Sequence, residues 1–373
     1  MKKILICFGT RPEAIKMCTL VHELRKCKFV VEVCATAQQR ELLDQVLDFF
    51  QVFPEYDLDI MTKNQNLNIL SGKLFIEFEE ILNKSNPDLV LVHGDTTTSC
   101  ICAWAAFNKN IKIGHVEAGL RTYNKQAPFP EEINRQITGR LSDFHFVPTT
   151  LSRDNLLNEK IDSKNIIVTG NTVIDALYWT LKKLESNFTN KIIEDLKLDI
   201  DFSKKIILVT CHRRENFGEG LLNICQALIK ISMDHDVQII FPVHLNPNIL
   251  APVLRILKNS SKIHLIAPLD YPSFIWVMKN CHLIITDSGG IQEEAPSIGK
   301  PVLVIRNTTE RTEALSTGMV KLVGTDIDLI YDNATELLFS ENLHSKNIEA
   351  KNPYGDGSAN QKIIKFLNEY LNN

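Results

Sequence analysis

One stretch decides the fold class of this chain: Thr286-Asp287-Ser288-Gly289-Gly290-Ile291-Gln292-Glu293-Glu294-Ala295. It follows an apolar run at 281–285, so it predicts a buried strand, a tight turn and a helix that ends near Gly299. Exposed N–H groups at such a helix start favour an anion, and glycine lets a bulky group approach the backbone. Taken alone, the stretch fits a phosphate site and an ordinary strand-to-helix turn equally well.

The composition is that of an ordinary globular protein. Its 373 residues suggest two domains, and 44% of them are hydrophobic and 23% charged. A net charge of −4, without a basic stripe, argues against nucleic-acid binding. The nine cysteines lack CxxC or Cys/His zinc spacing, which indicates buried free thiols and a reducing compartment. No signal peptide or membrane-spanning run is recognisable, so we expect a cytoplasmic protein that does not bind membranes.

Short apolar runs alternate with amphipathic segments from end to end, which predicts parallel sheets with helices on both faces. In the first half, strands are expected at 4–8, 30–35, 89–93, 111–116, 144–147 and 166–168. Helices are expected there at 39–50, 69–83, 97–108 and 131–141, with a surface loop at 53–68. A long helix at 173–185 and a polar segment at 186–205 lead to strands at 206–210, 237–241, 263–266, 283–286, 302–305 and 320–323, and to a last helix at 358–370.

The chain is therefore predicted to be α/β, with two Rossmann-like doubly wound domains facing each other across a cleft. We expect the first domain at 1–170 and the second at 171–357. Ligands of such domains bind outside the carboxyl ends of the strands.

Charged residues cluster at those strand ends. Asp95 and Glu117 each follow an expected strand, Glu131 opens a helix, and His212 follows the first strand of the second half. Each has a structural explanation, because Asp95 suits a helix N-cap and Glu131 complements a helix dipole. Three carboxylates that converge on a cleft opposite His212 and the Ser-Gly-Gly turn predict acid–base chemistry instead.

No cofactor is expected to assist that chemistry, and no metal. The first turn, Gly-Thr-Arg-Pro at 9–12, is not GxGxxG, which argues against a nicotinamide cofactor. The chain also lacks the GxxxxGK[ST] loop of nucleotide hydrolases.

Six segments, in order along nearly the whole chain, resemble the bacterial non-hydrolysing UDP-N-acetylglucosamine 2-epimerases. They are GTRPEAIKM at 9–17, HGDT at 93–96, HVEAGLRT at 115–122, PEEINR at 130–135, HRRENFG at 212–218 and DSGGIQEE at 287–294. The resemblance implies the glycosyltransferase-B arrangement, with a C-terminal helix at about 358–373 packing back on the first domain, and a homodimer. It implies reversible conversion of UDP-N-acetylglucosamine to UDP-N-acetylmannosamine. The route would be elimination and re-addition of UDP through 2-acetamidoglucal, in the supply of cell-surface polysaccharide synthesis.

Position by position, the resemblance implies the catalytic residues Asp95, Glu117, Glu131 and His212. It implies the UDP-sugar ligands Arg11, Lys16, Asp95, Glu117, His212, Leu269, Phe274, Ser288, Gly289, Gly290, Glu294 and Arg311. Among these, Ser288, Gly289 and Gly290 would hold phosphate and Glu294 the ribose hydroxyls, while Phe274 would lie in a loop beside uracil. Leu269 stands where some relatives have glutamine.

One departure concerns regulation. Gln38, Gln39 and Gln45 lie in a segment that resembles the site where many bacterial members bind a second UDP-N-acetylglucosamine as an allosteric activator. Gln39 stands where those members carry histidine, and 63–66 lacks an arginine of some activated members. We therefore expect weakened or altered activation.

Three other functions share part of the pattern. A paralogous epimerase on a 2,3-diacetamido or 6-deoxy UDP-sugar differs only around C3 and C6, which the sequence does not reveal. A UDP-sugar glycosyltransferase of the same architecture would share the phosphate turn but would need an acceptor and not the three carboxylates. A hydrolysing epimerase would release free N-acetylmannosamine.

Overall fold

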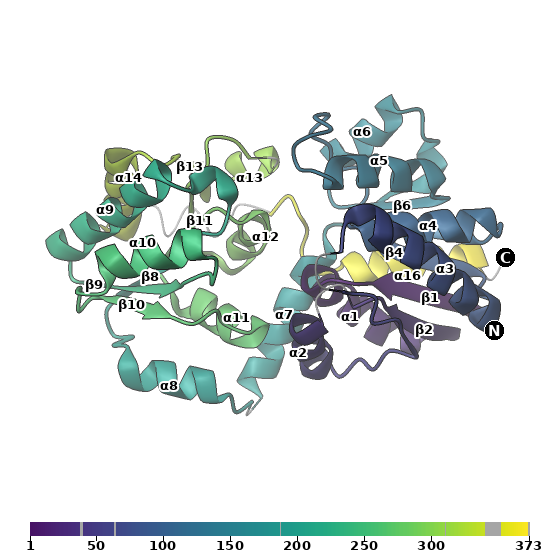
Figure 1. Ribbon diagram of the computed structural model, residues 1–373, viewed down its shortest axis with the longest axis horizontal. Coiled ribbons are helices and arrows are strands. Elements are labelled where there is room, and N and C mark those ends of the chain that lie inside the picture. The colour runs from purple at the N-terminus through teal and green to yellow at the C-terminus, as the bar shows by residue number, and fades with distance from the viewer. Residues whose placement is uncertain (38–39, 63–64, 187, 310, 340–351, 372–373) are drawn as a thin grey trace. The chain divides into compact units, whose positions relative to one another are not determined.

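A computed structural model of the chain describes residues 1–37, 40–62, 65–186, 188–309, 311–339 and 352–371. The chain divides into two compact units, which we call unit 1 (Met1–Trp179 with Tyr354–Asn373) and unit 2 (Thr180–Pro353). Each unit is a parallel sheet with helices on its faces (Figure 1), so the predicted pair of doubly wound α/β units is confirmed.

The described part of unit 1 holds a seven-stranded sheet in the order β3-β2-β1-β4-β5-β6-β7, and all of its pairings are parallel. The strands are β1 (Lys2–Phe8), β2 (Phe29–Ala35), β3 (Tyr56–Asp57), β4 (Leu89–His93), β5 (Lys112–Val116), β6 (Phe144–Val147) and β7 (Ile166–Val168). The helices are α1 (Arg11–Arg25), α2 (Arg40–Phe50), α3 (Leu67–Ser85), α4 (Thr97–Asn108), α5 (Glu131–Leu141), α6 (Thr150–Asn158), α7 (Thr172–Glu185) and α16 (Ala359–Leu371), with the 3-10 turn η1 (Ser163–Asn165).

The described part of unit 2 holds a six-stranded parallel sheet in the order β10-β9-β8-β11-β12-β13. The strands are β8 (Lys205–Thr210), β9 (Val237–Pro242), β10 (Ile263–Ile266), β11 (Leu283–Thr286), β12 (Val302–Val304) and β13 (Val320–Leu322). The helices are α8 (Lys191–Asp199), α9 (Glu219–Asp234), α10 (Pro247–Leu257), α11 (Tyr271–Asn280), α12 (Gly289–Glu294), α13 (Thr312–Leu315) and α14 (Ile327–Phe339), with the 3-10 turns η2 (Arg214–Asn216) and η3 (Ala295–Ile298).

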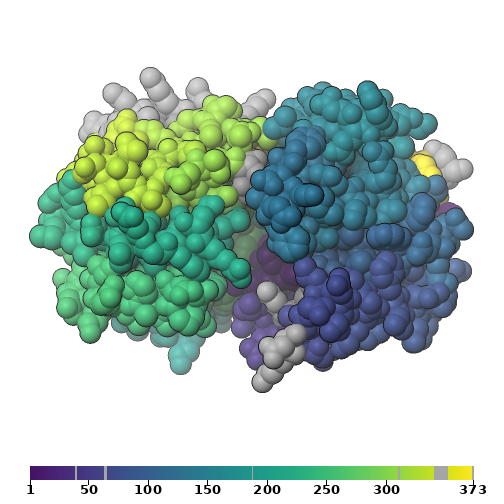
Figure 2. Space-filling model, turned by 45° about the horizontal axis from the view of Figure 1, so that its top comes forward, coloured from purple at the N-terminus to yellow at the C-terminus, as the bar shows by residue number. Residues whose placement is uncertain are grey.

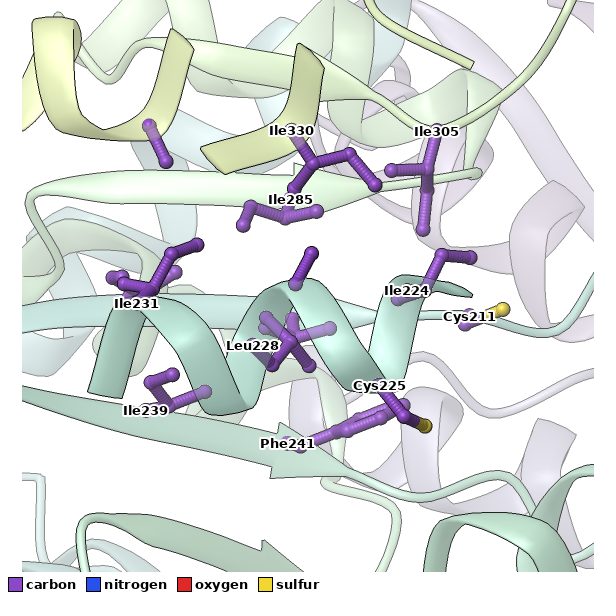
Figure 3. Packing of buried hydrophobic residues seen from close by; sticks show 14 of the residues in the cluster. Cys211, Ile224, Cys225, Leu228, Ile231, Ile239, Phe241, Ile285, Ile305 and Ile330 are labelled. Carbon is purple, nitrogen blue, oxygen red and sulfur yellow. The ribbon is translucent and has the colours of Figure 1, made fainter. Parts of the chain in front are cut away.

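Burial on both faces explains why the strands were predictable. Residues 4–8 of β1 and 206–209 of β8 are all fully buried, as expected for strands covered by helices on both sides. In unit 2, Ile224, Leu228 and Ile231 of α9 pack over Ile239 and Phe241 of β9 (Figure 3), within one continuous apolar cluster.

Two local predictions are wrong. The expected loop at 53–68 contains β3, a two-residue edge strand too short for an alternation pattern. The polar segment at 186–205, for which no element was predicted, contains α8, which Asn190 caps and which buries Ile193 and Leu196. The helix after Gly289 does not run to Gly299 but ends at Glu294 and continues as η3, because Pro296 has no N–H for α-helical bonding.

All nine cysteines are free, as predicted, and all but the half-buried Cys27 are buried. Cys281 follows α11 and is not part of a strand. Within the described ranges, we find no helix with both the length and the apolar character needed to cross a bilayer.

Each sheet has a switch point, the pair of neighbouring strands from which the chain winds in opposite directions. In unit 1 it lies between β1 and β4, and in unit 2 between β8 and β11. The turns that follow these strands diverge and leave a crevice at the carboxyl edge of the sheet, where open α/β sheets bind ligands. The predicted site residues Arg11, Asp95, His212 and Ser288 lie in or next to these four turns.

Candidate active site

Glu117 is the centre of the polar cluster in unit 1. It follows β5 directly, its φ is +61°, and it is 5% exposed. A positive φ is uncommon for a residue with a side chain and is found most often where function or packing requires it. Its carboxylate forms an ion pair with Lys16 of α1 and accepts a hydrogen bond of 2.9 Å from the Asn171 amide. The fold therefore holds a buried carboxylate at the strand edge by several donors.

Arg135 of α5 joins Glu117 to Asp95. Its guanidinium forms ion pairs with the Asp95 carboxylate and, at 3.2 Å, with Oε1 of Glu117, and it also donates to the Glu117 carbonyl. Asp95 itself is about one-third exposed, so it is the more accessible carboxylate of the two. Two carboxylates thus face two cations, Lys16 and Arg135, which offsets the repulsion between like charges.

His93 backs this cluster from the last position of β4. Its Nε2 lies 3.6 Å from Oε2 of Glu117, and neither ring nitrogen makes a hydrogen bond to another described residue. Burial lowers the pKa of His93 to about 4, so the ring is neutral at pH 7. It adds no positive charge to the site.

Glu131 does not join these groups. It is the first residue of α5, and its side chain makes no ion pair or hydrogen bond within the part of the chain that the structure describes. Its neighbour Glu132 instead holds the loop before the helix, by accepting hydrogen bonds from the backbone of Thr122 and Tyr123. Of the three predicted carboxylates, the structure brings together Asp95 and Glu117.

Arg11 and Lys16 both lie on α1, which begins in the turn after β1. Arg11 is the first helical residue, and Lys16 is one and a half turns further on, where it reaches Glu117. Both positions are on the edge of the sheet that was predicted to bind ligands.

In unit 2, His212 and Asp287 meet across the switch point. Nδ1 of His212 lies 2.9 Å from Oδ1 of the fully buried Asp287. The other oxygen, Oδ2, accepts the backbone N–H groups of His212 and Arg213, both at 2.8 Å, and the Asn216 amide at 3.1 Å. Burial by itself raises the pKa of Asp287, but the His212 ring and these donors outweigh it and lower the pKa below its usual value. An ionised Asp287 orients the half-exposed imidazole.

The Ser-Gly-Gly turn opens α12, with Ser288 at the N-cap and Gly289 and Gly290 as the first helical residues. Glu294 ends this helix and accepts a hydrogen bond of 3.1 Å from the Tyr271 hydroxyl. Arg311 lies beside α12, where its Nε forms an ion pair of 2.9 Å with the buried Glu293.

Two predicted UDP-sugar ligands, Leu269 and Phe274, lie near the start of α11. Leu269 is buried just before the helix. The prediction that Phe274 lies in a loop is wrong, because Asp270 caps the helix by accepting the Ser273 N–H and Pro272 fits its first turn. Phe274 is therefore a residue of α11.

The predicted activator residues are only partly within the structure. Gln38 and Gln39 lie outside the described residues, and Gln45 is an exposed residue of α2.

Sequence reasoning missed Arg135, Asn171 and Asp287 as members of these clusters. Arg135 carried a signal, since it stands four residues after Glu131 and such residues share a helix face. Asp287 directly follows β11, the position that identified Asp95 and Glu117 elsewhere. Asn171 gave no comparable signal, because it meets Glu117 only through the tertiary fold.

Two doubly wound parallel units with polar clusters at their switch points define a two-domain α/β enzyme of the glycosyltransferase-B fold class. The family model described as UDP-N-acetylglucosamine 2-epimerase matches residues 22–368. The chain belongs to this family, as the six sequence segments had indicated.

Individual relatives agree along the full length. A UDP-N-acetylglucosamine 2-epimerase from Escherichia coli (strain K12) is 52% identical, over 98% of this chain and 98% of that protein. One from Campylobacter jejuni is 51% identical, over 100% and 99%. The crystal structure of UDP-GlcNAc 2-epimerase from Neisseria meningitidis bound to UDP-GlcNAc has a TM-score of 0.92 at 47% identity and covers 100% of both chains.

Proposed function

We propose that this protein interconverts UDP-N-acetylglucosamine and UDP-N-acetylmannosamine by inverting the configuration at C2. The observation that carries the proposal is the full-length relationship, at 51–52% identity, to proteins named UDP-N-acetylglucosamine 2-epimerase. The bound UDP-GlcNAc named for the Neisseria meningitidis relative supports the same substrate.

The chemistry of the substrate favours elimination. C2 of an N-acetylhexosamine has no adjacent carbonyl, so its proton is not acidic enough for simple removal. We infer that a carboxylate takes the C2 proton while the C1–O bond to UDP breaks, and that the C–H electron pair becomes the C1=C2 double bond of 2-acetamidoglucal. Protonation of C2 on the opposite face, with return of UDP to C1, gives the epimer. Atoms and electrons balance without a redox cofactor.

The polar cluster of unit 1 supports the acid–base part. Asp95 and Glu117 lie at its centre and are held by Lys16 and Arg135, and positioned carboxylates of this kind serve as general acids and bases. Glu131, at the start of α5 that also carries Arg135, is the third candidate. Its unengaged side chain is available to a substrate.

The turns of unit 2 support the leaving-group part. We propose that Ser288, Gly289 and Gly290 bind the diphosphate with N–H groups, and that Glu294 accepts the ribose hydroxyls. His212, held by Asp287, stabilises the departing phosphate oxygen. Arg11 and Arg311 are proposed as further ligands of the UDP-sugar, with Leu269 and Phe274 beside the base.

The test is proton NMR of UDP-N-acetylglucosamine with the enzyme in deuterated water. We expect the manno signal to grow with deuterium at C2 and no acceptor present. Free N-acetylmannosamine, or turnover only with an added acceptor, would replace the proposal by a hydrolase or a transferase. Exchange only with a 2,3-diacetamido or 6-deoxy UDP-sugar would move the substrate to the paralogue.

Exposed apolar side chains on two helices of unit 1 support the proposed homodimer. Ile69 and Ile76 of α3, with Trp104 and Phe107 of α4, are 42–68% exposed, and α3 packs against α4. Blue atoms, which belong to this part of the chain, lie at the surface of unit 1 in Figure 2. Large exposed apolar side chains on neighbouring helices suit a contact surface. Light scattering should give twice the chain mass, and Ile76→Asp should halve it; a monomeric wild type would contradict this.

Three further points rest on the family resemblance. We propose that the enzyme is cytoplasmic, that it supplies cell-surface polysaccharide synthesis, and that activation by UDP-N-acetylglucosamine is weakened. A hyperbolic rate curve with UDP-N-acetylmannosamine alone would support weakened activation, and strict dependence on added UDP-N-acetylglucosamine would refute it.

A further inference from the structure

Glu13 is a buried carboxylate that the chemistry above does not use. It is the third residue of α1 and 2% exposed. Its Oε2 accepts the backbone N–H groups of Gly9 and Thr10 at 3.0 and 2.8 Å and the Thr10 hydroxyl at 2.8 Å. Its Oε1 accepts the hydroxyl of Thr96 at 2.7 Å. One side chain therefore holds residues from two different turns.

Those two turns are the ones that diverge at the switch point of unit 1. Thr10 lies in the turn from β1 to α1, and Thr96 in the turn from β4 to α4. The first turn leads into the helix that carries Lys16, and the second contains Asp95, next to Thr96. Both Lys16 and Asp95 take part in the cluster around Glu117 and Arg135. The Glu13 carboxylate thus lies between the two segments whose spacing sets that cluster.

A helix cap explains only part of this arrangement. A glutamate at the third helical position commonly reaches back to the N-cap N–H, which accounts for the bond to Thr10. It does not account for the bond to Thr96, which is 83 residues away in sequence. Thr96 is itself the N-cap of α4 and accepts the Ser99 N–H, so its hydroxyl connects two helix starts.

The surroundings leave little room for another arrangement. Gly9 lies so close to the neighbouring segments that a Cβ there would be 2.1 Å from the Thr36 hydroxyl oxygen and 2.5 Å from that of Thr98. Thr36 and Thr98 in turn share a hydrogen bond of 2.8 Å. The backbone of the first turn is thus pressed between the end of β2 and α4, and Glu13 supplies the acceptor for its N–H groups.

We propose that Glu13 is a positioning residue, whose carboxylate fixes the turn after β1 against the turn after β4 and so sets the distance of Lys16 and Asp95 from Glu117. This positioning role belongs to the proposed epimerase reaction, and its kinetic test therefore rests on the proposed function. The Gly9 and Thr10 N–H groups can only donate, so the group beside them must accept at Oε2, whereas the Thr96 hydroxyl at Oε1 can donate or accept. Glutamine can keep both contacts only by turning its oxygen to the N–H groups and donating to Thr96, and alanine can make neither contact.

The variants follow from that requirement. Glu13→Gln keeps the shape and removes one acceptor, and Glu13→Ala removes both. Glu23→Gln is the matched control, because Glu23 lies on the same helix, is partly exposed and, among the described residues, forms a local ion pair with Lys26. We expect kcat for epimerisation to fall about 10- to 100-fold in Glu13→Ala, as for a small misplacement of reacting groups, and less in Glu13→Gln, with the control unchanged.

A purely structural role would give a different pattern. It would lower the melting temperature and the yield of folded enzyme but leave kcat and KM per folded molecule unchanged. A double variant separates the two: in a Lys16→Met background, Glu13→Ala should add less than about threefold to the loss, because residues that act as a unit are not additive. Full kcat in folded Glu13→Ala, or full additivity with Lys16→Met, would overturn the proposal.

Hydrogen exchange measured by mass spectrometry tests the positioning without any substrate. Glu13→Ala should speed exchange at both 9–16 and 94–99, whereas faster exchange at 9–16 alone would reduce Glu13 to a helix cap. If the wild type does not epimerise the UDP-sugar, the proposed function fails, and this measurement still decides the role of Glu13.

Discussion

Replacing Arg135 by methionine removes the cation that joins Asp95 to Glu117. The guanidinium is 5% exposed, forms ion pairs with both carboxylates and donates to the Glu117 carbonyl. Removing one partner of a buried ion pair costs about 3–5 kcal/mol, because the remaining charge loses its compensation. That is a large share of the roughly 5–15 kcal/mol that holds a domain folded, and for a unit of this size it corresponds to a fall in Tm of about 6–20 °C.

The loss should depend on pH with a definite sign. Without Arg135, a buried carboxylate beside a second one has a raised pKa, so the folded state binds a proton more tightly than the unfolded state. Its stability is then present at low pH and is lost as pH rises. We expect the difference in free energy of unfolding between wild type and Arg135→Met to shrink from pH 8 to pH 5, and a second change, Glu117→Gln, to restore part of it.

Urea unfolding at pH 5, 7 and 8, followed by circular dichroism, measures these differences. Arg140→Met is the matched control, since Arg140 is an exposed residue of the same helix. Arg135→Met/Glu117→Gln should regain stability without regaining turnover. Equal stability of Arg135→Met and wild type at all three pH values would refute the view that Arg135 compensates the two carboxylates.

Three further predictions concern single side chains. Asp95→Asn or Glu117→Gln should each lower kcat about 100-fold or more in the NMR assay, and near-normal turnover would remove that residue from the chemistry. His212→Asn should lower kcat by about 10- to 1000-fold, as for loss of a group that stabilises a leaving oxygen, with stability little changed because the ring is 42% exposed. Burial raises the pKa of Asp175 from 3.8 to about 6, so its stabilising contribution is complete below pH 4 and is lost as pH rises through 6. Relative to Asp175→Asn, the wild type should therefore lose about 2 kcal/mol of unfolding free energy between pH 4 and 7 in chemical denaturation, and parallel profiles would contradict this.

The strands were predictable because their signal is local. The run Ile4–Phe8 within β1 is continuous and apolar, and only a strand buried on both faces requires that in so short a segment. The two-residue strand β3 has no such run, since it exists through its pairing with Cys34 and Ala35 of β2. Pairing with a neighbouring strand leaves no pattern in so short a segment, so β3 could not be predicted from its own residues.

The site shows the same difference between residues that a local sequence pattern reveals and residues that only the packing brings together. Asp95 and Glu117 could be found because each directly follows a strand, and the carboxyl ends of parallel strands meet at one edge. Their shared partner, Arg135, is set by how α5 packs. A spacing of four places Arg135 and Glu131 on one helix face, but it did not reveal that Arg135 would contact the two carboxylates and Glu131 would not. The structure turns Arg135 toward the carboxylates and leaves Glu131 unengaged.

In each unit a buried carboxylate bridges the two turns at the switch point, Glu13 in unit 1 and Asp287 in unit 2. The groups that surround the two carboxylates differ, and so do the shifts of their pKa values. Asp287 faces an imidazole that can carry positive charge, which with the N–H donors lowers its pKa and keeps it ionised. Around Glu13 the hydrogen-bonding partners are neutral, so burial dominates and raises the pKa of Glu13 to about 7 despite the hydrogen bonds it accepts. Asp287 holds the His212 ring in place at 2.9 Å, which suits a group that meets a departing anion. Glu13 has no such ring to hold, so its effect must come from geometry, through the two turns that it joins.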